Sequence, residues 1–283
     1  MLNRQKALLQ LVRLAGGEID RLVLTKWAFI IRQETASRGG ESFYDFVPYQ
    51  YGPFSFALYQ EAEKLVAIGY LKERGNSRWA LGDLAAPPVD EKLRQDLSRV
   101  STRFQKASTD ELLDYVYHNY PYFTIHSKRK RLAKRAVASL AVYTAGYEAK
   151  SVDAFLNGLT ENGIDHLIDV RMNPIARRYG FHRSTLSRLS NLLGIKYNHV
   201  PQLGIASELR QELNSEEDYH ALFRRYESTT LKQESAAIQS VADWIQQSPS
   251  VLVCMEAEPT CCHRLHLAKS VSQLTGLPIV HLE

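Results

Sequence analysis

The sequence predicts an α/β protein in which a mainly helical winged-helix domain precedes a mostly parallel, three-layer α/β domain. Up to about residue 139, apolar residues recur mainly at helical spacing, whereas from Leu140 short apolar runs alternate with helical segments. Such alternation is typical of a parallel sheet with right-handed crossovers. Charge divides the chain at the same place, because residues 1–139 carry 22 Lys+Arg against 15 Asp+Glu and residues 140–283 carry 13 against 16.

Bulk composition restricts the class of protein. With 283 residues and 45% hydrophobic content, the chain is long enough for two domains with real cores. No apolar run approaches the ~18 residues that span a bilayer, and the N-terminal segment lacks the features of a signal peptide. All three cysteines lie between Cys254 and Cys262, which argues against a disulfide framework. We therefore expect a cytoplasmic protein with no membrane partner.

The winged-helix expectation for residues 1–84 rests on three helices followed by a β-hairpin. The helices are expected near 4–14, 20–35 and 54–68, and the hairpin at 70–81 carries Arg74 and Arg78 near its Gly75-Asn76 turn. Winged helices bind nucleic acid or form contacts with another protein or a second copy of the chain. The third helix is acidic and so is a poor match for the DNA major groove, and both interpretations remain. A homodimer is therefore possible.

The stretch from Tyr49 to Leu71, with its Tyr-Gly-Pro-Phe sequence and its Leu-Val-Ala-Ile-Gly-Tyr-Leu ending, resembles the Panacea-type (SocA antitoxin-like) domain. The resemblance covers roughly the first 125 residues. It implies a toxin–antitoxin or phage-defence setting.

Residues 85–139 are expected to form a helical extension and a basic linker. Helices are predicted at about 90–106 and 109–119, and a basic run follows that includes Lys128, Arg129, Lys130 and Arg131. Such a run is usually a solvated face, but its position between two domains makes contact with a nucleic-acid backbone a fair hypothesis. We expect DNA rather than RNA as the partner of these residues and of Arg74 and Arg78.

The α/β domain, residues 140–283, is predicted to contain five strands, at about 141–147, 166–171, 196–200, 251–254 and 278–282, and polar side chains follow the first four. The loops after parallel strands open on one edge of the sheet, where ligands bind. Any one of these residues could have a purely structural role, as a loop cap or as a buried residue of a strand. Polar side chains at the ends of four strands together indicate a site. The expected substrate- and phosphate-binding residues are Tyr143, Gly146, Tyr147, Arg171, Asn173, Arg177, Arg178, His199, Cys262 and Arg264, and the expected catalytic residues are Asp169, Glu256, Cys254 and His263.

These residues stand in motifs that resemble a known family. The motifs T-A-G-Y, I-D-V-R-x-N-P-x-x-R-R-x-G-F, Y-x-H-V-P-x-L-G and C-M-E-A-E-P-T-C-C-H-R-x-x-L-A occur in order within about 141–283. Together they resemble the domain of unknown function 488 family. The resemblance covers the α/β domain and implies little about its activity, because the function of the family is not established.

Three chemistries fit the edge. In the first, Asp169 and Glu256 serve cleavage of a glycosidic bond, as in a DNA glycosylase-like hydrolase. The aromatic side chains that would stack a flipped base are Tyr143, Tyr147, Tyr179 and Phe181. In the second, Cys254 or Cys262 is a nucleophile activated by His263 and a helix N-terminus. The third is a non-catalytic nucleotide sensor, in which the acids pair with the arginines. No cofactor is expected, and no metal, because Cys261-Cys262-His263 lacks the C-x-x-C spacing of common zinc sites.

Overall fold

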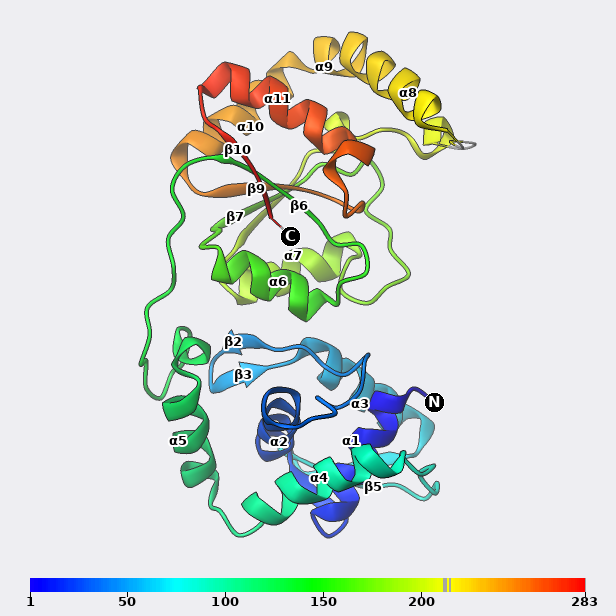
Figure 1. The fold of residues 1–283 in the computed structure, drawn as a ribbon, viewed down its shortest axis with the longest axis vertical. Coiled ribbons are helices and arrows are strands. Elements are labelled where there is room, and N and C mark those ends of the chain that lie inside the picture. The colour runs from blue at the N-terminus through cyan, green and yellow to red at the C-terminus, as the bar shows by residue number, and fades with distance from the viewer. Residues whose placement is uncertain (211–212, 214, 283) are drawn as a thin grey trace. The chain divides into compact units, whose positions relative to one another are not determined.

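The computed structural model describes residues 1–210, 213 and 215–282 and divides the chain into two compact units, Met1–Lys134 and Arg135–Glu283 (Figure 1). The protein is of mixed α/β class, as predicted, with a mainly helical first unit and a parallel sheet in the second. Among the described residues, no helix combines the length and the apolar character needed to cross a membrane.

The first unit contains five helices, three short β-pairings and a 3-10 turn among its described residues. In chain order they are α1 (Asn3–Leu14), β1 (Glu18–Asp20), α2 (Arg21–Glu34), β2 (Val47–Tyr49), β3 (Gly52–Phe54), α3 (Phe56–Ile68), β4 (Leu71–Arg74), β5 (Arg78–Leu81), α4 (Glu91–Phe104), α5 (Thr109–Asn119) and η1 (Pro121–Thr124).

Local sequence explains the ends of the third helix. The Ser55 side chain accepts a hydrogen bond from the Leu58 backbone N–H, which satisfies one of the free donors at the start of α3. Gly69 ends the helix in the left-handed conformation with φ 97°, where glycine is favoured. The chain then enters the predicted hairpin, in which β4 and β5 pair antiparallel from Leu71 opposite Leu81 to Arg74 opposite Arg78.

The predicted three helices and hairpin are confirmed, and two features are additional. β1 pairs with β5 to give a three-stranded sheet in the order β1-β5-β4, and the β2–β3 hairpin stands before α3. The expected extension is part of the same unit, because α4 and α5 contribute Leu97, Val100 and Leu113 to a core shared with α1 and α2. The winged-helix assignment and the Panacea-type resemblance stay predictions.

The second unit is a parallel sheet covered by helices. Its elements are β6 (Val142–Gly146), α6 (Val152–Glu161), β7 (His166–Asp169), α7 (Arg183–Leu192), β8 (Lys196–His199), η2 (Pro201–Leu203), η3 (Ser207–Arg210), α8 (Glu216–Ser228), α9 (Thr230–Gln233), α10 (Ser235–Gln247), β9 (Ser250–Cys254), η4 (Pro259–Cys261), α11 (His263–Thr275) and β10 (Ile279–Leu282). All five predicted strands are present.

The sheet has the order β10-β6-β9-β7-β8, with every pairing parallel. Figure 1 shows α6 and α7 on one side of this sheet and α10 and α11 on the other, which gives the predicted three layers. One face packs strand residues such as Val142 and Leu252 against Val241 of α10 and Leu267 of α11.

The strand order creates a change of direction at β9. The helices that follow its two neighbours, β6 and β7, cover one face of the sheet, whereas α11, which follows β9, covers the other (Figure 1). The carboxyl end of β9 is therefore the point where successive crossovers diverge, and such a point in an open α/β sheet is where ligands bind.

Candidate functional site

Four reactive side chains meet where β9 ends and α11 begins. The Sγ atoms of Cys254 and Cys262 lie 3.0 and 3.1 Å from Oε2 of Glu256, and each thiol donates a hydrogen bond to that carboxylate. Nδ1 of His263 lies 3.8 Å from Cys254 Sγ and 3.9 Å from Cys262 Sγ. We call Cys254, Glu256, Cys262 and His263 the thiol cluster.

The turn between β9 and α11 is shaped by its own polar groups. The Glu258 carboxylate accepts from the backbone N–H of Thr260 at the start of η4, and the chain then enters α11 with Cys262 as N-cap. Arg264 donates from Nη1 to the carbonyl oxygen of Glu256 at 2.5 Å and from Nη2 to that of Ala257 at 2.8 Å. The predicted phosphate ligand Arg264 is thus only 1% exposed and holds the backbone of the turn.

The imidazole of His263 has a fixed orientation. Its Nε2 lies 3.1 Å from the carbonyl oxygen of Val170, which can only accept, so Nε2 carries the proton. Nδ1 consequently faces the two sulfurs. The ring of Tyr226 packs edge-on against the imidazole at 5.5 Å, and its hydroxyl donates to the carbonyl oxygen of Leu203.

Asp169, the predicted catalytic acid of β7, is held in a buried ion pair. Both of its oxygens accept hydrogen bonds from Arg171, at 2.8 Å from Nε and 2.5 Å from Nη2, and Tyr197 donates to Oδ2 at 2.7 Å. The Asp169 side chain is fully buried and that of Arg171 is 5% exposed. Arg171 and Tyr197 thus occupy both oxygens of the carboxylate, and its catalytic role stays a prediction.

Arg171 is held on all sides. Nη1 also donates to the Tyr147 hydroxyl at 2.8 Å and to the carbonyl oxygen of Phe181 at 3.0 Å. Burial lowers the pKa of Arg171, but the hydrogen bonds and charge of Asp169 outweigh it and hold that pKa above its ordinary value. Arg171 is therefore a buried positioning group, and the predicted phosphate contact does not fit its surroundings.

The predicted base-stacking aromatics contact each other. Tyr147 and Phe181 are stacked with ring centroids 4.1 Å apart, and both are buried. Tyr143 is also buried, and its hydroxyl donates to the carbonyl oxygen of Ser139. The rings of Tyr147 and Phe181 therefore pack on each other in the core, which leaves neither shared face open to a flipped base.

The remaining predicted residues differ in exposure. Asn173, Arg177 and Arg178 are exposed in the loop after β7, and Arg178 donates to the carbonyl oxygen of Lys150. His199 is partly buried, and its Nε2 lies 2.8 Å from the carbonyl oxygen of Arg171. Arg177 and Arg178 are thus the predicted phosphate ligands that remain open to solvent.

Protonation in the cluster follows burial and contacts. Burial opposes ionisation of Glu256, but the hydrogen bonds from the Cys254 and Cys262 thiols outweigh it, so the pKa of the carboxyl lies below its ordinary value. Burial raises the pKa of the Cys262 thiol well above its ordinary value. Without a further partner, Cys262 is therefore a thiol and a poor nucleophile.

A concave surface adjoins the cluster at η4. A pocket of about 380 Å³ is lined by Thr260 and Cys261 of η4 together with residues on and near α8: Leu213, Ser215, Glu216, Tyr219, His220 and Phe223. The sequence reasoning missed Tyr219, His220 and Phe223 because α8 has an ordinary amphipathic pattern. Tyr197 was missed too, although it stands in the Y-x-H-V-P motif beside His199.

The predicted nucleic-acid contacts lie in the first unit and differ in their partners. Arg78 pairs with Glu18, and Arg129 pairs with both Asp110 and Asp114. Arg74 and Lys130 are exposed, and no ion pair to another described residue is found for either. Lys128 is exposed as well, while Arg131 donates to the carbonyl oxygen of Ser127.

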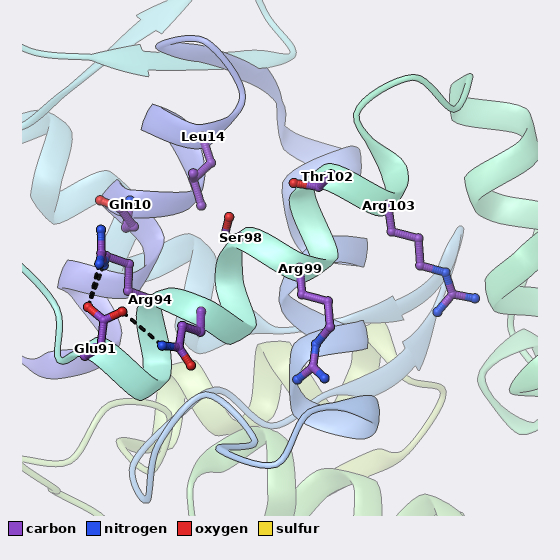
Figure 2. A pocket seen from close by; sticks show the side chains of 9 residues that line it. Gln10, Leu14, Glu91, Arg94, Ser98, Arg99, Thr102 and Arg103 are labelled. Carbon is purple, nitrogen blue, oxygen red and sulfur yellow. Dashed lines mark hydrogen bonds and ion pairs between the residues drawn. The ribbon is translucent and has the colours of Figure 1, made fainter.

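A second basic surface of the first unit was not predicted. A pocket of about 640 Å³ lies between α1 and α4. Figure 2 shows Arg94, Arg99 and Arg103 among the side chains that line it. All three arginines are engaged, since Arg94 pairs with Glu91, Arg99 with Asp96 and Arg103 with Glu34. The positive charge of this surface is therefore largely neutralised.

No metal was predicted for the cysteines and the histidine, because their spacing along the chain differs from that of common zinc sites, and this stays a prediction. Ligand atoms of Cys254, Cys262 and His263 all lie within 4.8 Å of one another, and all three residues are buried. Their spacing along the chain does not reveal this proximity, because Cys254 is at the end of β9 and the other two residues are at the start of α11.

Residues 151–271 match the family model described as Domain of unknown function DUF488. The match begins at the N-cap of α6, reaches into α11 and includes the thiol cluster and the Asp169–Arg171 pair, so the family resemblance predicted from the motifs is confirmed for these residues. No curated protein and no solved structure matches the chain.

Proposed function

We propose that the second unit is an enzyme that cleaves a base or nucleotide bond in nucleic acid, as a DNA glycosylase-like hydrolase does. Its reaction centre is the turn between β9 and α11, with Glu256 as the carboxylate that activates the attacking water or stabilises developing positive charge. The first unit delivers the nucleic acid. An antiviral setting is part of the proposal and rests on the resemblance of the first 125 residues alone.

The observation that carries this proposal is the placement of the Glu256 carboxylate. It contacts two cysteine sulfurs at 3.0 and 3.1 Å, at the carboxyl end of the strand where the crossovers diverge. Burying a carboxylate, two thiols and an imidazole together lowers the stability of the fold. Clusters of this kind are typical of sites that bind a ligand or carry out a reaction.

The neighbouring pocket supplies a second support. Tyr219 and Phe223 of α8 line it on one side, and Thr260 and Cys261 of η4 line it on the other. Phe223 is buried and packs against His266, so Tyr219 is the aromatic side chain that we propose stacks on a nucleobase, a contact worth ~1–3 kcal/mol per base. Exposed Arg177 and Arg178 in the loop after β7 are the candidates for phosphate contact.

The competing proposal is a non-catalytic regulator that senses a nucleotide. One observation favours it, because Asp169 and Arg171 form a buried ion pair. In a site that only binds an anionic nucleotide, acidic side chains would have to be paired in this way so that they do not repel the ligand. The pair removes one of the two carboxylates expected for glycosidic cleavage and leaves Glu256 to carry the chemistry.

The deciding experiment is incubation of the pure protein with single- and double-stranded DNA, unmodified and base-modified. Released base is measured by mass spectrometry and backbone cleavage by a strand-break assay. We expect Glu256→Gln to lower turnover by ~10²–10⁴-fold, the usual contribution of a general base. The matched control is Glu258→Gln, because that exposed carboxylate contacts Thr260 and lies outside the thiol cluster.

Two results would change the proposal. Equal turnover in Glu256→Gln and Glu258→Gln would remove Glu256 from the chemistry. No product from any substrate, with DNA binding retained, would favour the regulator.

A further inference from the structure

We propose that Cys254, Cys262 and His263 bind one divalent metal ion of the zinc type, with the Glu256 carboxylate beside the open fourth position. The donors are the two Sγ atoms and Nδ1 of the imidazole. The proposed function does not require this metal, and metal binding can be measured without a substrate.

The distances between the donor atoms are close to those of a tetrahedral site. Zinc bonds of ~2.3 Å to sulfur and ~2.0–2.1 Å to nitrogen place neighbouring sulfur and nitrogen ligands about 3.5 Å apart. The observed separations from His263 Nδ1 are 3.8 Å to Cys254 Sγ and 3.9 Å to Cys262 Sγ. These two separations exceed that value by a few tenths of an ångström, and all three donor atoms lie within 4.8 Å of one another.

The histidine is oriented as a metal ligand requires. Ligating histidines usually donate the N–H of the other ring nitrogen to a carbonyl or carboxylate, which fixes the ring and exposes the ligating lone pair. His263 does this through Nε2 and the carbonyl oxygen of Val170 at 3.1 Å. Tyr226 packs against the ring edge-on at 5.5 Å and restricts its rotation.

Burial and local charge favour a bound cation over a bare cluster. Cys254, Cys262 and His263 are 0, 1 and 3% exposed, so thiolates here would be far from water. Two thiolates and a nearby carboxylate need compensation by positive charge. Arg264 and the N-terminus of the 13-residue helix α11, which starts at His263, supply part of it, and a divalent ion supplies the rest.

The ligand set also indicates the type of ion and of site. Thiolate and imidazole ligands in a tetrahedral arrangement are typical of zinc, whereas magnesium and calcium take oxygen ligands. Three protein ligands, two thiolates and one imidazole, form a catalytic zinc set that keeps a fourth position for water or substrate. Glu256 Oε2, at 3.0 and 3.1 Å from the sulfurs, stands next to that position and is placed to accept a proton there.

Two measurements on the full chain test the proposal. The first is metal content by inductively coupled plasma mass spectrometry, after removal of bound metal with a chelator and reconstitution with zinc alone. The second is the absorption spectrum with cobalt(II) in place of zinc, in which thiolate ligation gives a charge-transfer band and tetrahedral geometry gives intense visible bands. The spectrum of the unmutated chain tests the site without a variant that fails to fold.

The sequence offers a matched control for the variants. We expect one equivalent of zinc in the unmutated chain and in Cys261→Ser, whose exposed thiol lies outside the cluster, and a loss of at least ~100-fold in affinity in Cys254→Ser and Cys262→Ser. Glu256→Gln should retain one equivalent because it removes no ligand.

Three results would overturn the assignment. The first is no zinc bound by the unmutated chain together with a cobalt spectrum that lacks the thiolate band. The second is equal affinity in Cys254→Ser and Cys261→Ser. The third is loss of zinc in Glu256→Gln, which would refute three-residue ligation. A zinc-loaded protein without turnover would refute the proposed function alone, and turnover by a chain that fails to bind zinc on reconstitution would refute the metal alone.

Discussion

Gly146, the last residue of β6, lies so close to the turn after β9 that a Cβ atom on it would stand 1.9 Å from the carbonyl oxygen of Glu256. The same oxygen accepts a hydrogen bond from Nη1 of Arg264. The backbone of Glu256 is thus fixed between a glycine on the neighbouring strand and a guanidinium on the following helix. The position of the carboxylate depends on both contacts.

We expect Gly146→Ala to displace this turn. The added methyl group meets backbone atoms of Glu256 and Ala257, which cannot move aside as a flexible side chain can, so the free energy of unfolding should fall by about 1–3 kcal/mol. Zinc affinity and turnover should fall with it. Gly158→Ala is the control, because a Cβ at that position in α6 meets nothing within 4 Å and should stabilise the helix by ~0.5–1 kcal/mol. Equal urea unfolding curves for the two variants would contradict the close contact.

Asp169→Asn should destabilise the second unit by about 3–5 kcal/mol, because it leaves the buried Arg171 guanidinium without its ionic partner. Asp165→Asn breaks the more exposed pair with Arg135 and should cost less than about 1 kcal/mol. Urea unfolding followed by far-ultraviolet circular dichroism compares the two. Similar costs would mean that the Asp169–Arg171 pair does not hold the sheet edge.

Lys26 gives the first unit a pH-dependent stability. Burial lowers the pKa of this lysine to about 7, and its ammonium group donates to the carbonyl oxygen of Pro53. The unfolded chain, with an ordinary lysine pKa near 10.4, binds more protons than the folded one between pH 7 and about 10.4. The first unit should therefore gain about 2 kcal/mol of stability from pH 7 to pH 9.

Lys26→Met should remove most of that gain, since methionine fills similar space without a charge. Urea unfolding at both pH values, followed by the fluorescence of Trp27 and Trp79, measures the change. The same increase in the variant would show that another group is responsible.

If the basic run contacts DNA, Lys130→Ala should weaken binding more than Arg129→Ala. Arg129 is already paired with Asp110 and Asp114, so its charge is partly neutralised. Loss of one phosphate contact should lower affinity for all DNA sequences and reduce the salt slope of log K by about 1. Binding titrations over a range of salt concentrations measure both. An unchanged slope in Lys130→Ala would exclude this residue from the interface.

Elements with strong periodic patterns could be predicted from the sequence. The strand Val251 to Cys254 is an uninterrupted apolar run, and the helix Thr109–Asn119 begins at a polar cap and acidic first turn, so both were placed within one residue or two. β1 and the β2–β3 hairpin were missed, because each strand has three residues and Pro48 and Pro53 obscure the strand pattern.

The location of the site could be predicted from the sequence, but the contacts between its side chains could not. Parallel strands fix which residues reach the same edge, and the thiol cluster lies there. The pairing of Asp169 with Arg171, and of Arg264 with the carbonyl of Glu256, depends on side-chain directions that no spacing encodes. The nearness of His263 to Cys254 and Cys262 was expected from the sequence, but the contact of both thiols with Glu256 was not.

The position of β9 in the sheet affects how the second unit is made during translation. β6 and β7 both pair with β9 and not with each other, so neither gains its central neighbour until residues 250–254 have left the ribosome. Until then β6 and β7 present unpaired edges, which are prone to association with other chains. A ribosome stalled before residue 250 should therefore hold this unit in a protease-sensitive state, although more than a hundred of its residues have already been synthesised.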